Sequence, residues 1–369
     1  MSAKKFTKKK AKTGEKKLKP TRAVEKAAEK SKVKEEPVVP PGKLKICVIG
    51  PGAIGGLIAA YLKSKRRIVS VIGKPEHKRI IRSDGLKIES AKSTVLVELD
   101  IREEMWEKPD LVILAVRIPD IGKVLDKNRK FLEGSIVLTI QHGVKADQVV
   151  SLALGKENII SSIIMFGSTR LKPSLIKLDF EGDWIMGRPF GANDDKVKEI
   201  VEEFAPAFKI TPVENITSMK WLKLIIETPY CIPAILGKTI PEAFADLTMA
   251  QLGVLLLKES LAAVEDAGIK PASLPNFDLD KLKQLIALPI KEAAQKFSET
   301  MTKMPKSNID YLRDMDYING EIVSLARFGR VGSMLNTRAV ILAKKVKKTN
   351  TFLNSEDMTQ AYNRELTPN

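Results

Sequence analysis

The sequence has few of the residues on which metal centres and disulfide frameworks depend. Its 369 residues include two cysteines and two histidines. Cys47 and Cys231 stand far apart and outside any CxxC or CxH spacing, and His77 and His142 are too few for a histidine-based metal site. The cysteine usage excludes a disulfide-stapled secreted scaffold and fits a reducing cytoplasm. We expect no bound metal.

Long apolar runs are also scarce. No stretch comes near the roughly 18 apolar residues that cross a bilayer, because charges interrupt the longest runs within a few positions. The first residues lack the apolar central region of a secretory signal, and their mixed lysines and glutamates do not resemble an Arg- and Ser-rich transit peptide. We therefore expect a soluble, cytoplasmic protein with no membrane partner.

The net charge of +17 is concentrated at the N-terminus. Residues 1–42 carry 13 Lys and one Arg against five Glu, which is about half of the excess. This segment offers no apolar core and ends in the helix-breaking sequence EEPVVPPGK, so residues 1–43 are predicted to form a disordered, Lys-rich tail. We interpret it as a solubilising extension, and weak contact with RNA, DNA or another polyanion is the alternative. Phe6 is the one aromatic residue among these lysines, which gives base stacking little support.

Apolar runs of strand length alternate with helical patterns through the first half of the chain. A strand over 44–50, a glycine turn and a helix lead into a second strand over 67–73, which is the βαβ spacing of a parallel sheet. Further buried strands are predicted over 111–116, 135–140 and 159–166. Residues 172–188 alternate in short runs and are predicted to form antiparallel strands on one edge. The sequence thus indicates an α/β fold, with a Rossmann-type doubly wound sheet over 44–211.

Helical periodicity dominates from about residue 212 onward. It is strongest over 249–268, 279–301 and 309–329, and strand-like runs disappear. We predict a mostly α-helical domain over 212–349 that supplies the substrate and catalytic residues. Residues 350–369 are expected to be a frayed polar end.

A glycine turn joins the first strand to the helix that follows it. Gly50, Gly52 and Gly55 form GxGxxG in the context that gives the pattern meaning, between a buried strand and a helix. The first glycine permits a tight turn, the second lets the backbone approach a pyrophosphate, and the third allows close packing of helix on strand. We predict dinucleotide binding here, a packing turn being the alternative, and the predicted contacts are Gly50, Pro51, Gly52, Ala53, Ile54 and Gly55.

The end of the second strand decides which dinucleotide binds, because an Asp or Glu usually holds the NAD ribose there. In VIGKPEHKR the first charged residue is Lys74, and a cation at this place suits the additional 2′-phosphate of NADP. His77, Lys78 and Arg79 follow closely. NADP is therefore the favoured cofactor, although solvated surface charges give the same pattern and Glu76 keeps that alternative open.

The chain resembles the ketopantoate reductase (2-dehydropantoate 2-reductase) family over about residues 44–346. The resemblance rests on landmarks in the right order, which are GPGAIGG, GKPEHKRIIRSDGLKIES, AVR, IQHGV, WLKLIIE, ILGKT, MDYING and LNTR. It implies reduction of a 2-keto acid with NADPH, in pantothenate biosynthesis, with the cofactor in the first domain. A homodimer is a further expectation.

The resemblance also implies which residues carry the chemistry. Reduction of a keto acid adds a hydride to carbon and a proton to oxygen, so an acid or a cation must face that oxygen. In the family this group is the lysine of a WxK pattern, which Trp221 and Lys223 match. A lysine on an amphipathic helix is more often simply solvated, and this alternative stays open. A carboxylate before the DYxNG segment, usually Glu, is matched by Asp314, which is one methylene shorter.

Other positions depart from the family pattern. Asparagines normally stand four and eight residues after the lysine, where this chain has Glu227 and Cys231, and the usual QNG turn contains His142. Arg117 replaces a lysine that lines the cofactor site. The nearest match to a substrate-binding serine is Ser307. The resemblance thus implies cofactor contacts at Arg117 and His142, and substrate contacts at Glu227, Cys231 and Ser307.

Three hypotheses follow from these residues. The first is an NADPH-dependent reductase of ketopantoate. The second is a reductase of the same family with a different 2-keto substrate, because the asparagines are missing. The third is an NADP-binding protein that has lost catalysis. In addition, Pro229 and Pro233 are expected to disturb a regular helix after the lysine.

Overall fold

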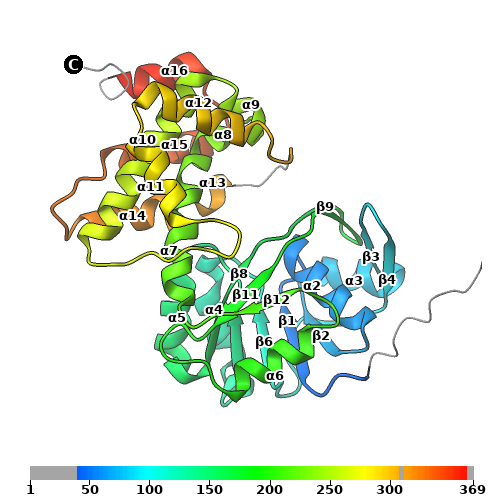
Figure 1. Cartoon of the computed structure of the whole chain (residues 1–369). Helices are drawn as coiled ribbons and strands as arrows, with labels where there is room; N and C mark the ends of the chain where they lie inside the picture. The colour runs from blue at the N-terminus through cyan, green and yellow to red at the C-terminus, as the bar shows by residue number, and fades with distance from the viewer. Residues whose placement is uncertain (1–39, 307–310, 364–369) are drawn as a thin grey trace, which may run out of the picture. The chain divides into compact units, whose positions relative to one another are not determined.

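The computed structural model describes residues 40–306 and 311–363, and the chain from Pro40 onward forms one compact unit (Figure 1). The predicted tail, apart from its last four residues, lies outside the described residues, and so does Ser307.

The first half of the chain forms an eight-stranded sheet in the order β12-β11-β8-β7-β6-β1-β2-β5. Neighbouring strands are parallel, except that β11 runs antiparallel to β8. The strands are β1 (Lys45–Ile49), β2 (Ile68–Ile72), β5 (Asp100–Arg102), β6 (Leu111–Leu114), β7 (Ile136–Thr139), β8 (Ile159–Ile164), β11 (Trp184–Gly187) and β12 (Ile210–Pro212). Because β1 lies between β2 and β6, the chain order reverses there, and a ligand crevice is expected at the carboxyl ends of these strands.

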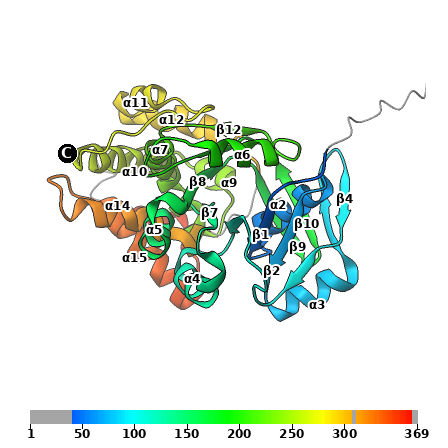
Figure 2. The same cartoon turned by 90° about the horizontal axis from the view of Figure 1, so that it is seen from below.

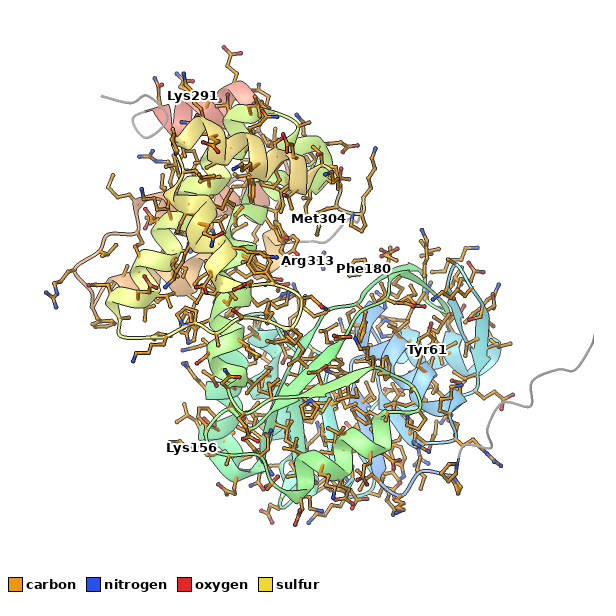
Figure 3. All side chains as sticks on the ribbon, viewed as in Figure 1. Tyr61, Lys156, Phe180, Lys291, Met304 and Arg313 are labelled. Carbon is orange, nitrogen blue, oxygen red and sulfur yellow. The ribbon has the colours of Figure 1, made fainter. Side chains whose placement is uncertain are left out.

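Helices cover both faces of this sheet (Figure 2). One apolar core joins the sheet to α2 and α6, and a second core joins it to α4 and α5. The helical segments of this half are α2 (Ala53–Ser64), α3 (Pro75–Asp84), α4 (Ile118–Leu132), α5 (Lys145–Leu154), η1 (Lys156–Asn158) and α6 (Asp195–Phe204). Tyr61 of α2, labelled in Figure 3, has its ring centroid 5.8 Å from that of Phe208. The doubly wound α/β fold predicted from the sequence is confirmed.

A second sheet of four strands, in the order β4-β3-β10-β9, was not predicted. Its strands are β3 (Leu86–Glu89), β4 (Thr94–Val97), β9 (Gly167–Lys172) and β10 (Leu175–Phe180). The prediction that 172–188 forms edge strands of one sheet was wrong in part, because β10 belongs to this second sheet and β11 lies inside the first. The reason is packing on α2: a Cβ added at Gly56 would meet the side chain of Ile176, so the helix approaches β10 closely.

The second half of the chain is helical, as predicted. Its segments are α7 (Ile216–Glu227), η2 (Thr228–Tyr230), α8 (Cys231–Leu236), α9 (Ile240–Phe244), α10 (Leu247–Asp266), α11 (Leu279–Ala287), α12 (Ile290–Met301), α13 (Tyr311–Asp314), η3 (Met315–Tyr317), α14 (Asn319–Ala326), α15 (Met334–Thr349) and α16 (Ser355–Ala361). Pro229 stands in the short turn between α7 and α8, so the disturbance expected there is confirmed, whereas Pro233 lies within α8. Pro289 likewise divides the single helix predicted over 279–301 into α11 and α12.

Helix α10 is the central element of this half. Among the described residues it is the one helix that is long and apolar enough to cross a membrane, a segment that the search for long apolar runs did not predict. Of its most apolar window, 61% is buried inside the protein. It therefore forms the core of the helical half, packed against α12, α14 and α15.

The chain end does not fray where the sequence predicts it. Residues 355–361 form α16, and Met358 and Tyr362 are fully buried against the helical core. The Tyr362 hydroxyl donates a hydrogen bond to the Leu335 carbonyl at 3.2 Å. Two large apolar side chains on one helical face outweigh the polar composition of this segment.

A buried ion pair ties the first helix of the helical half to the large sheet. Lys220 of α7 is 2% exposed, and its Nζ donates to Asp147 Oδ2 and to Ser161 Oγ, each at 3.0 Å. Asp147 lies in α5, and it also accepts hydrogen bonds from Ser161 at 2.7 Å and from Thr139. The charge of each partner is therefore compensated inside the protein, where an isolated charge is costly.

Removing one partner of this pair is expected to destabilise the fold. Lys220→Met leaves the Asp147 carboxylate buried without its cation, which costs about 3–5 kcal/mol in the free energy of unfolding. Urea unfolding followed by circular dichroism measures this loss. Lys92→Met is the control, because it removes an exposed ion pair with Glu181 and is expected to cost less than about 1 kcal/mol. Equal effects of the two substitutions would contradict the structural role of Lys220.

Candidate functional site

Each of the three glycines in the turn after β1 has a different structural role. Gly50 has φ +101°, and an added Cβ would meet the Ala115 backbone. A Cβ at Gly55 would collide with the Gly50 carbonyl and the Ala115 side chain, so this glycine allows α2 to approach the sheet. A Cβ at Gly52 would meet no atom within 4 Å. The fold therefore needs Gly50 and Gly55, whereas the open side at Gly52 suits the approach of a pyrophosphate.

The other residues of the turn complete an anion site. Pro51 is buried, and Ala53 and Ile54 are partly exposed in the first turn of α2. This turn contains no acidic residue, and its N-cap makes no side-chain hydrogen bond. The backbone N–H groups at the helix start thus remain available for a phosphate, and the residues present fit a dinucleotide.

Cations gather where the second strand ends. Lys74 is exposed at the N-cap of α3, and Arg170, from β9 of the second sheet, donates a hydrogen bond to His77 Nε2 at 2.7 Å. Burial, followed by the charge of Arg170, lowers the pKa of His77, so this imidazole accepts as a neutral ring. Lys78 forms an ion pair with Glu103 at 2.9 Å. Arg170 is therefore a second cation beside Lys74, which sequence reasoning missed because it lies 93 residues from His77 along the chain.

The turn after β7 holds the large sheet and α7 together. Gln141 Nε2 donates to the carbonyl oxygens of Leu114 at 2.7 Å and Val116 at 2.8 Å, which ties this turn to the end of β6. Gly143 has φ +69°, and a Cβ there would meet the Tyr317 carbonyl and the Leu224 side chain. The residue between Gln141 and Gly143 is thereby placed against the helical half.

That residue, His142, contacts Glu227 of α7. Its Nδ1 lies 3.0 Å from both carboxylate oxygens of Glu227. Lys223 Nζ donates to Glu227 Oε1 at 2.5 Å, which is an (i, i+4) pairing along α7. Glu227 is 2% exposed, and burial alone would raise its pKa, but the charges and hydrogen bonds of His142 and Lys223 lower it to about 2. The carboxylate therefore stays ionised between two basic groups.

Two tyrosines enclose this cluster. The Tyr311 ring lies edge-on to His142 with centroids 6.1 Å apart, and the Tyr230 ring lies 5.0 Å from that of Tyr311. Burial, followed by the Glu227 charge, raises the pKa of both phenols. They remain neutral and shield the carboxylate from water.

Asp314 and Arg117 lie at the margin of the cluster. Asp314 ends α13, one helical turn after Tyr311, and Arg117 is exposed just before α4. Burial raises the pKa of the Tyr317 hydroxyl, and so do the charges of Asp316 and Asp314, whereas Arg117 lowers it. Both predicted residues therefore act on the same phenol, from the two halves of the chain.

Cys231 faces away from the site. It is 1% exposed within the helical core, and burial raises its pKa even though Asn319 bonds the thiol. Asn319 also donates to the Thr228 carbonyl at 3.0 Å and to Asn336 Oδ1 at 2.9 Å. The predicted substrate contact of Cys231 is not supported, because the side chain belongs to a buried polar network behind α7. The asparagine of MDYING, which could have signalled this network, was treated only as a landmark.

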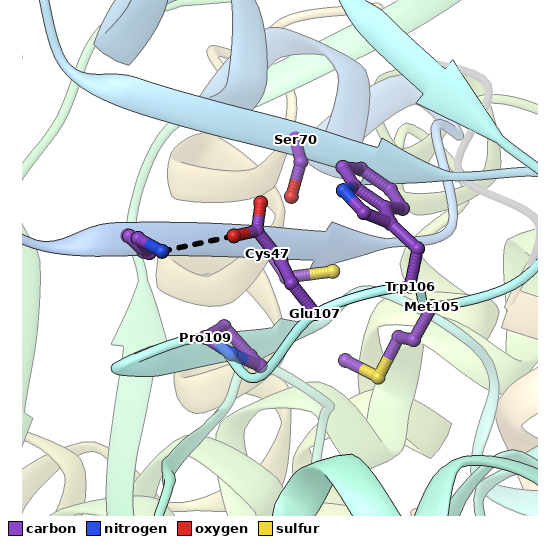
Figure 4. A pocket seen from close by; sticks show the side chains of 7 residues that line it. Cys47, Ser70, Met105, Trp106, Glu107 and Pro109 are labelled. Atoms are coloured by element: carbon purple, nitrogen blue, oxygen red, sulfur yellow. Dashed lines mark hydrogen bonds and ion pairs between the residues drawn. The ribbon is translucent and has the colours of Figure 1, made fainter.

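The small hollow around Cys47 is not a ligand site (Figure 4). Its volume is about 10 Å³, enough for a single water molecule at most, and the Lys45–Glu107 ion pair crosses its mouth. Burial raises the pKa of Cys47 to about 12. Among the described residues no group of three or more His, Cys, Asp and Glu side chains could hold a metal ion.

Comparisons with known proteins agree with this geometry. Residues 46–189 match a family model described as Ketopantoate reductase PanE/ApbA. A 2-dehydropantoate 2-reductase of Pyrococcus abyssi is 28% identical over 79% of this chain and 94% of that protein, and one of Pyrococcus horikoshii is 24% identical over the same shares.

Solved structures show the same fold at low identity. D-mandelate dehydrogenase with NADH and anilino(oxo)acetate superposes with a TM-score of 0.72 at 18% identity, covering 83% of this chain and 99% of that one. The 2-dehydropantoate 2-reductase of Geobacter metallireducens superposes with a TM-score of 0.69 at 18% identity, covering 82% and 99%.

The sheet, its glycine turn and the basic groups beside it define a dinucleotide-dependent oxidoreductase with a helical second half. Within that class, residues 46–189 resemble the ketopantoate reductase family, and the curated relatives to which the chain is similar are 2-dehydropantoate 2-reductases.

The glycine turn gives a test that separates binding from folding. Gly52→Ala adds a methyl group on the open side of the turn, where it obstructs a pyrophosphate. We expect an unchanged melting temperature and at least about tenfold weaker NADPH binding, the equivalent of one lost charged hydrogen bond. Gly55→Ala overpacks the helix against the sheet and is expected to cost about 1–3 kcal/mol of stability. Fluorescence titration and thermal melts measure the two effects, and undiminished binding by Gly52→Ala would contradict the assignment.

Proposed function

We propose that this protein reduces 2-dehydropantoate to pantoate with NADPH, the reaction after which its curated relatives are named. The observation that carries the proposal is the position of Lys223. It follows Trp221 in the WxK pattern and forms an ion pair with Glu227. Glu227 also contacts His142 in the QHG turn, which follows β7 of the dinucleotide-binding sheet. NADPH is the cofactor of this family.

Different residues of the chain have different roles in this reaction. The N–H groups of the glycine turn bind the pyrophosphate, and Lys74 and Arg170 bind the 2′-phosphate. The reduced nicotinamide, when bound, supplies a hydride to the keto carbon. The ammonium of Lys223 faces the keto oxygen and stabilises the negative charge that develops there. Glu227 fixes that ammonium by one short hydrogen bond, so little rotamer freedom is lost when the substrate binds.

A second candidate function is reduction of a different 2-keto acid by the same residues. Glu227 favours it, because it stands where the family keeps an asparagine that binds the substrate, and a carboxylate repels the carboxylate of ketopantoate. Loss of catalysis with retention of NADP binding is the third candidate. The two basic partners of Glu227 offset part of its repulsion, which favours an enzyme.

The location, pathway, oligomeric state and polyanion contact of the enzyme are also part of the proposal. A cytoplasmic location, a place in pantothenate biosynthesis, a homodimer and weak polyanion contact through residues 1–43 follow from the family and the charge distribution. Gel filtration at low and high salt, with and without RNA, tests the last two: the dimer persists at both salt concentrations, and the RNA contact is lost at high salt.

Turnover by wild type and Lys223→Met tests the function. Oxidation of NADPH is followed with ketopantoate and a panel of other 2-keto acids. Lys223→Met is expected to lower kcat/KM by about 10²–10⁴, because the charge facing the oxygen is lost. Lys291→Met, on the exposed surface of α12, is the control and keeps full activity. Turnover only of another acid supports the second candidate, and binding of NADPH with no turnover supports the third.

Cofactor preference tests the cations at the end of β2. Lys74→Ala and Arg170→Ala each remove one cation from the proposed 2′-phosphate site. We expect KM for NADPH to rise about tenfold, the equivalent of about 1.4 kcal/mol, while KM for NADH stays the same. A parallel rise for both cofactors would place these residues outside the 2′-phosphate site.

A further inference from the structure

The two clearest departures from the family pattern touch each other. His142 stands in the turn where the family has an asparagine, and Glu227 stands at a second asparagine position one helical turn after Lys223. Both carboxylate oxygens of Glu227 lie 3.0 Å from His142 Nδ1. Two amides have thus been replaced by a carboxylate–imidazole pair, which can hold and release a proton.

The geometry fixes the roles of the two imidazole nitrogens. Glu227 is ionised and accepts hydrogen bonds, so Nδ1 of His142 carries the proton that it donates to the carboxylate. Nε2 lies on the opposite side of the ring. The hydrogen bonds that the described residues make to this ring engage Nδ1 alone, and 36% of the side chain is exposed. Nε2 is therefore the nitrogen that can meet a ligand.

The charged and titratable groups around His142 come from several elements. Glu227 and Lys223 lie on α7, Tyr230 on η2 and Tyr311 on α13. Both phenols have raised pKa values and stay neutral. The carboxylate of Glu227 thus dominates the local field at the imidazole.

Two further charges lie near the same ring. Asp314 ends the short helix that carries Tyr311, and Lys145 begins α5, three residues after His142. Lys145 is exposed, where solvent screens its charge.

Glu227 changes what Lys223 can contribute. A lysine opposite two asparagines presents a full positive charge to the substrate, whereas here the ammonium shares its charge with a carboxylate at 2.5 Å. The Lys223–Glu227 pair carries no net charge. A substrate carboxylate and a developing oxyanion still need positive charge, and a protonated His142 supplies it. A carboxylate on Nδ1 is the arrangement that orients an imidazole and stabilises its protonated form.

We propose that His142 is the residue that protonates the substrate oxygen, that Glu227 positions it, and that Lys223 acts beside it as a fixed charge. The inference rests on the proposed reductase function. As the keto carbon accepts a hydride from the reduced nicotinamide, the carbonyl π pair becomes a lone pair on oxygen. That oxygen takes the proton from Nε2. The imidazole is then neutral. Its Nδ1–H still donates to the Glu227 carboxylate, and Nε2 takes up a new proton from solvent.

The pH dependence of kcat/KM tests the donor. In wild type, kcat/KM for the best 2-keto acid falls about tenfold per pH unit on the alkaline side, where the proton donor has lost its proton. His142→Asn restores the family residue, and it is expected to lose about 10²–10³ in kcat/KM near pH 6.5 and to lose this descending limb. Since the ring is partly exposed, the variant is expected to fold as wild type does, which circular dichroism checks.

A second variant tests the positioning residue. Glu227→Gln keeps the size and the acceptor oxygen but removes the negative charge beside the donor, so the descending limb in kcat/KM moves to lower pH. Glu292→Gln is the matched control, because it breaks an exposed (i, i+4) pair with Lys296 at 2.9 Å on α12. This control leaves the pH profile where it is in wild type.

The chain has two histidines, which makes a direct measurement possible. Nitrogen-15 spectra of wild type contain two imidazole systems, and comparison with His77→Asn assigns that of His142. At high pH we expect the Nδ1–H tautomer of His142, because Glu227 accepts from that nitrogen.

The outcomes separate this inference from the proposed function. If His142→Asn keeps kcat/KM within about twofold of wild type across the pH range while Lys223→Met abolishes turnover, Lys223 is the donor and the inference is overturned. An Nε2–H tautomer in wild type also overturns it. If wild type reduces no 2-keto acid at all, the proposed function fails, and the inference falls with it.

Discussion

The site depends on one carboxylate that is kept ionised inside the protein. Glu227 is almost fully buried, and burial alone favours its neutral form, so its charge persists only because a lysine and a histidine contact it. The lysine comes from the same helix, whereas the histidine comes from a turn of the large sheet. The electrostatics of the site therefore require both halves of the chain to be in place.

Local sequence predicted the elements whose signals are local. The apolar run before Gly50, the spacing to Gly55 and the helix after it needed only neighbouring residues, and the structure has them. The (i, i+4) spacing of Lys223 and Glu227 is likewise a local pattern that brings the two side chains together on a helix. The partner of Glu227 from the other half could not be foreseen, because His142 lies 85 residues away and no pattern fixes how α7 packs on the sheet.

The wrong predictions concern residues whose positions depend on contacts with distant segments of the chain. The four-stranded second sheet joins segments whose short alternating runs carry no indication of their partners, and Arg170 reaches His77 only through that sheet. Met358 and Tyr362 become core residues because the helical half offers a surface for them, which polar composition concealed. Family resemblance assigned Cys231 a substrate contact, but the short helix after Pro229 places the thiol in the core.

Helix α7 carries two lysines three positions apart, and both are anchored to the large sheet. Lys220 is held directly through Asp147, and Lys223 is held indirectly through Glu227 and His142. Three residues are nearly one helical turn, so the anchors lie close together along one side of the helix. A hinge motion that swings α7 away from the sheet breaks a buried ion pair and the site in the same event. Helix α7 is therefore the fixed element of the site, relative to which other segments can move.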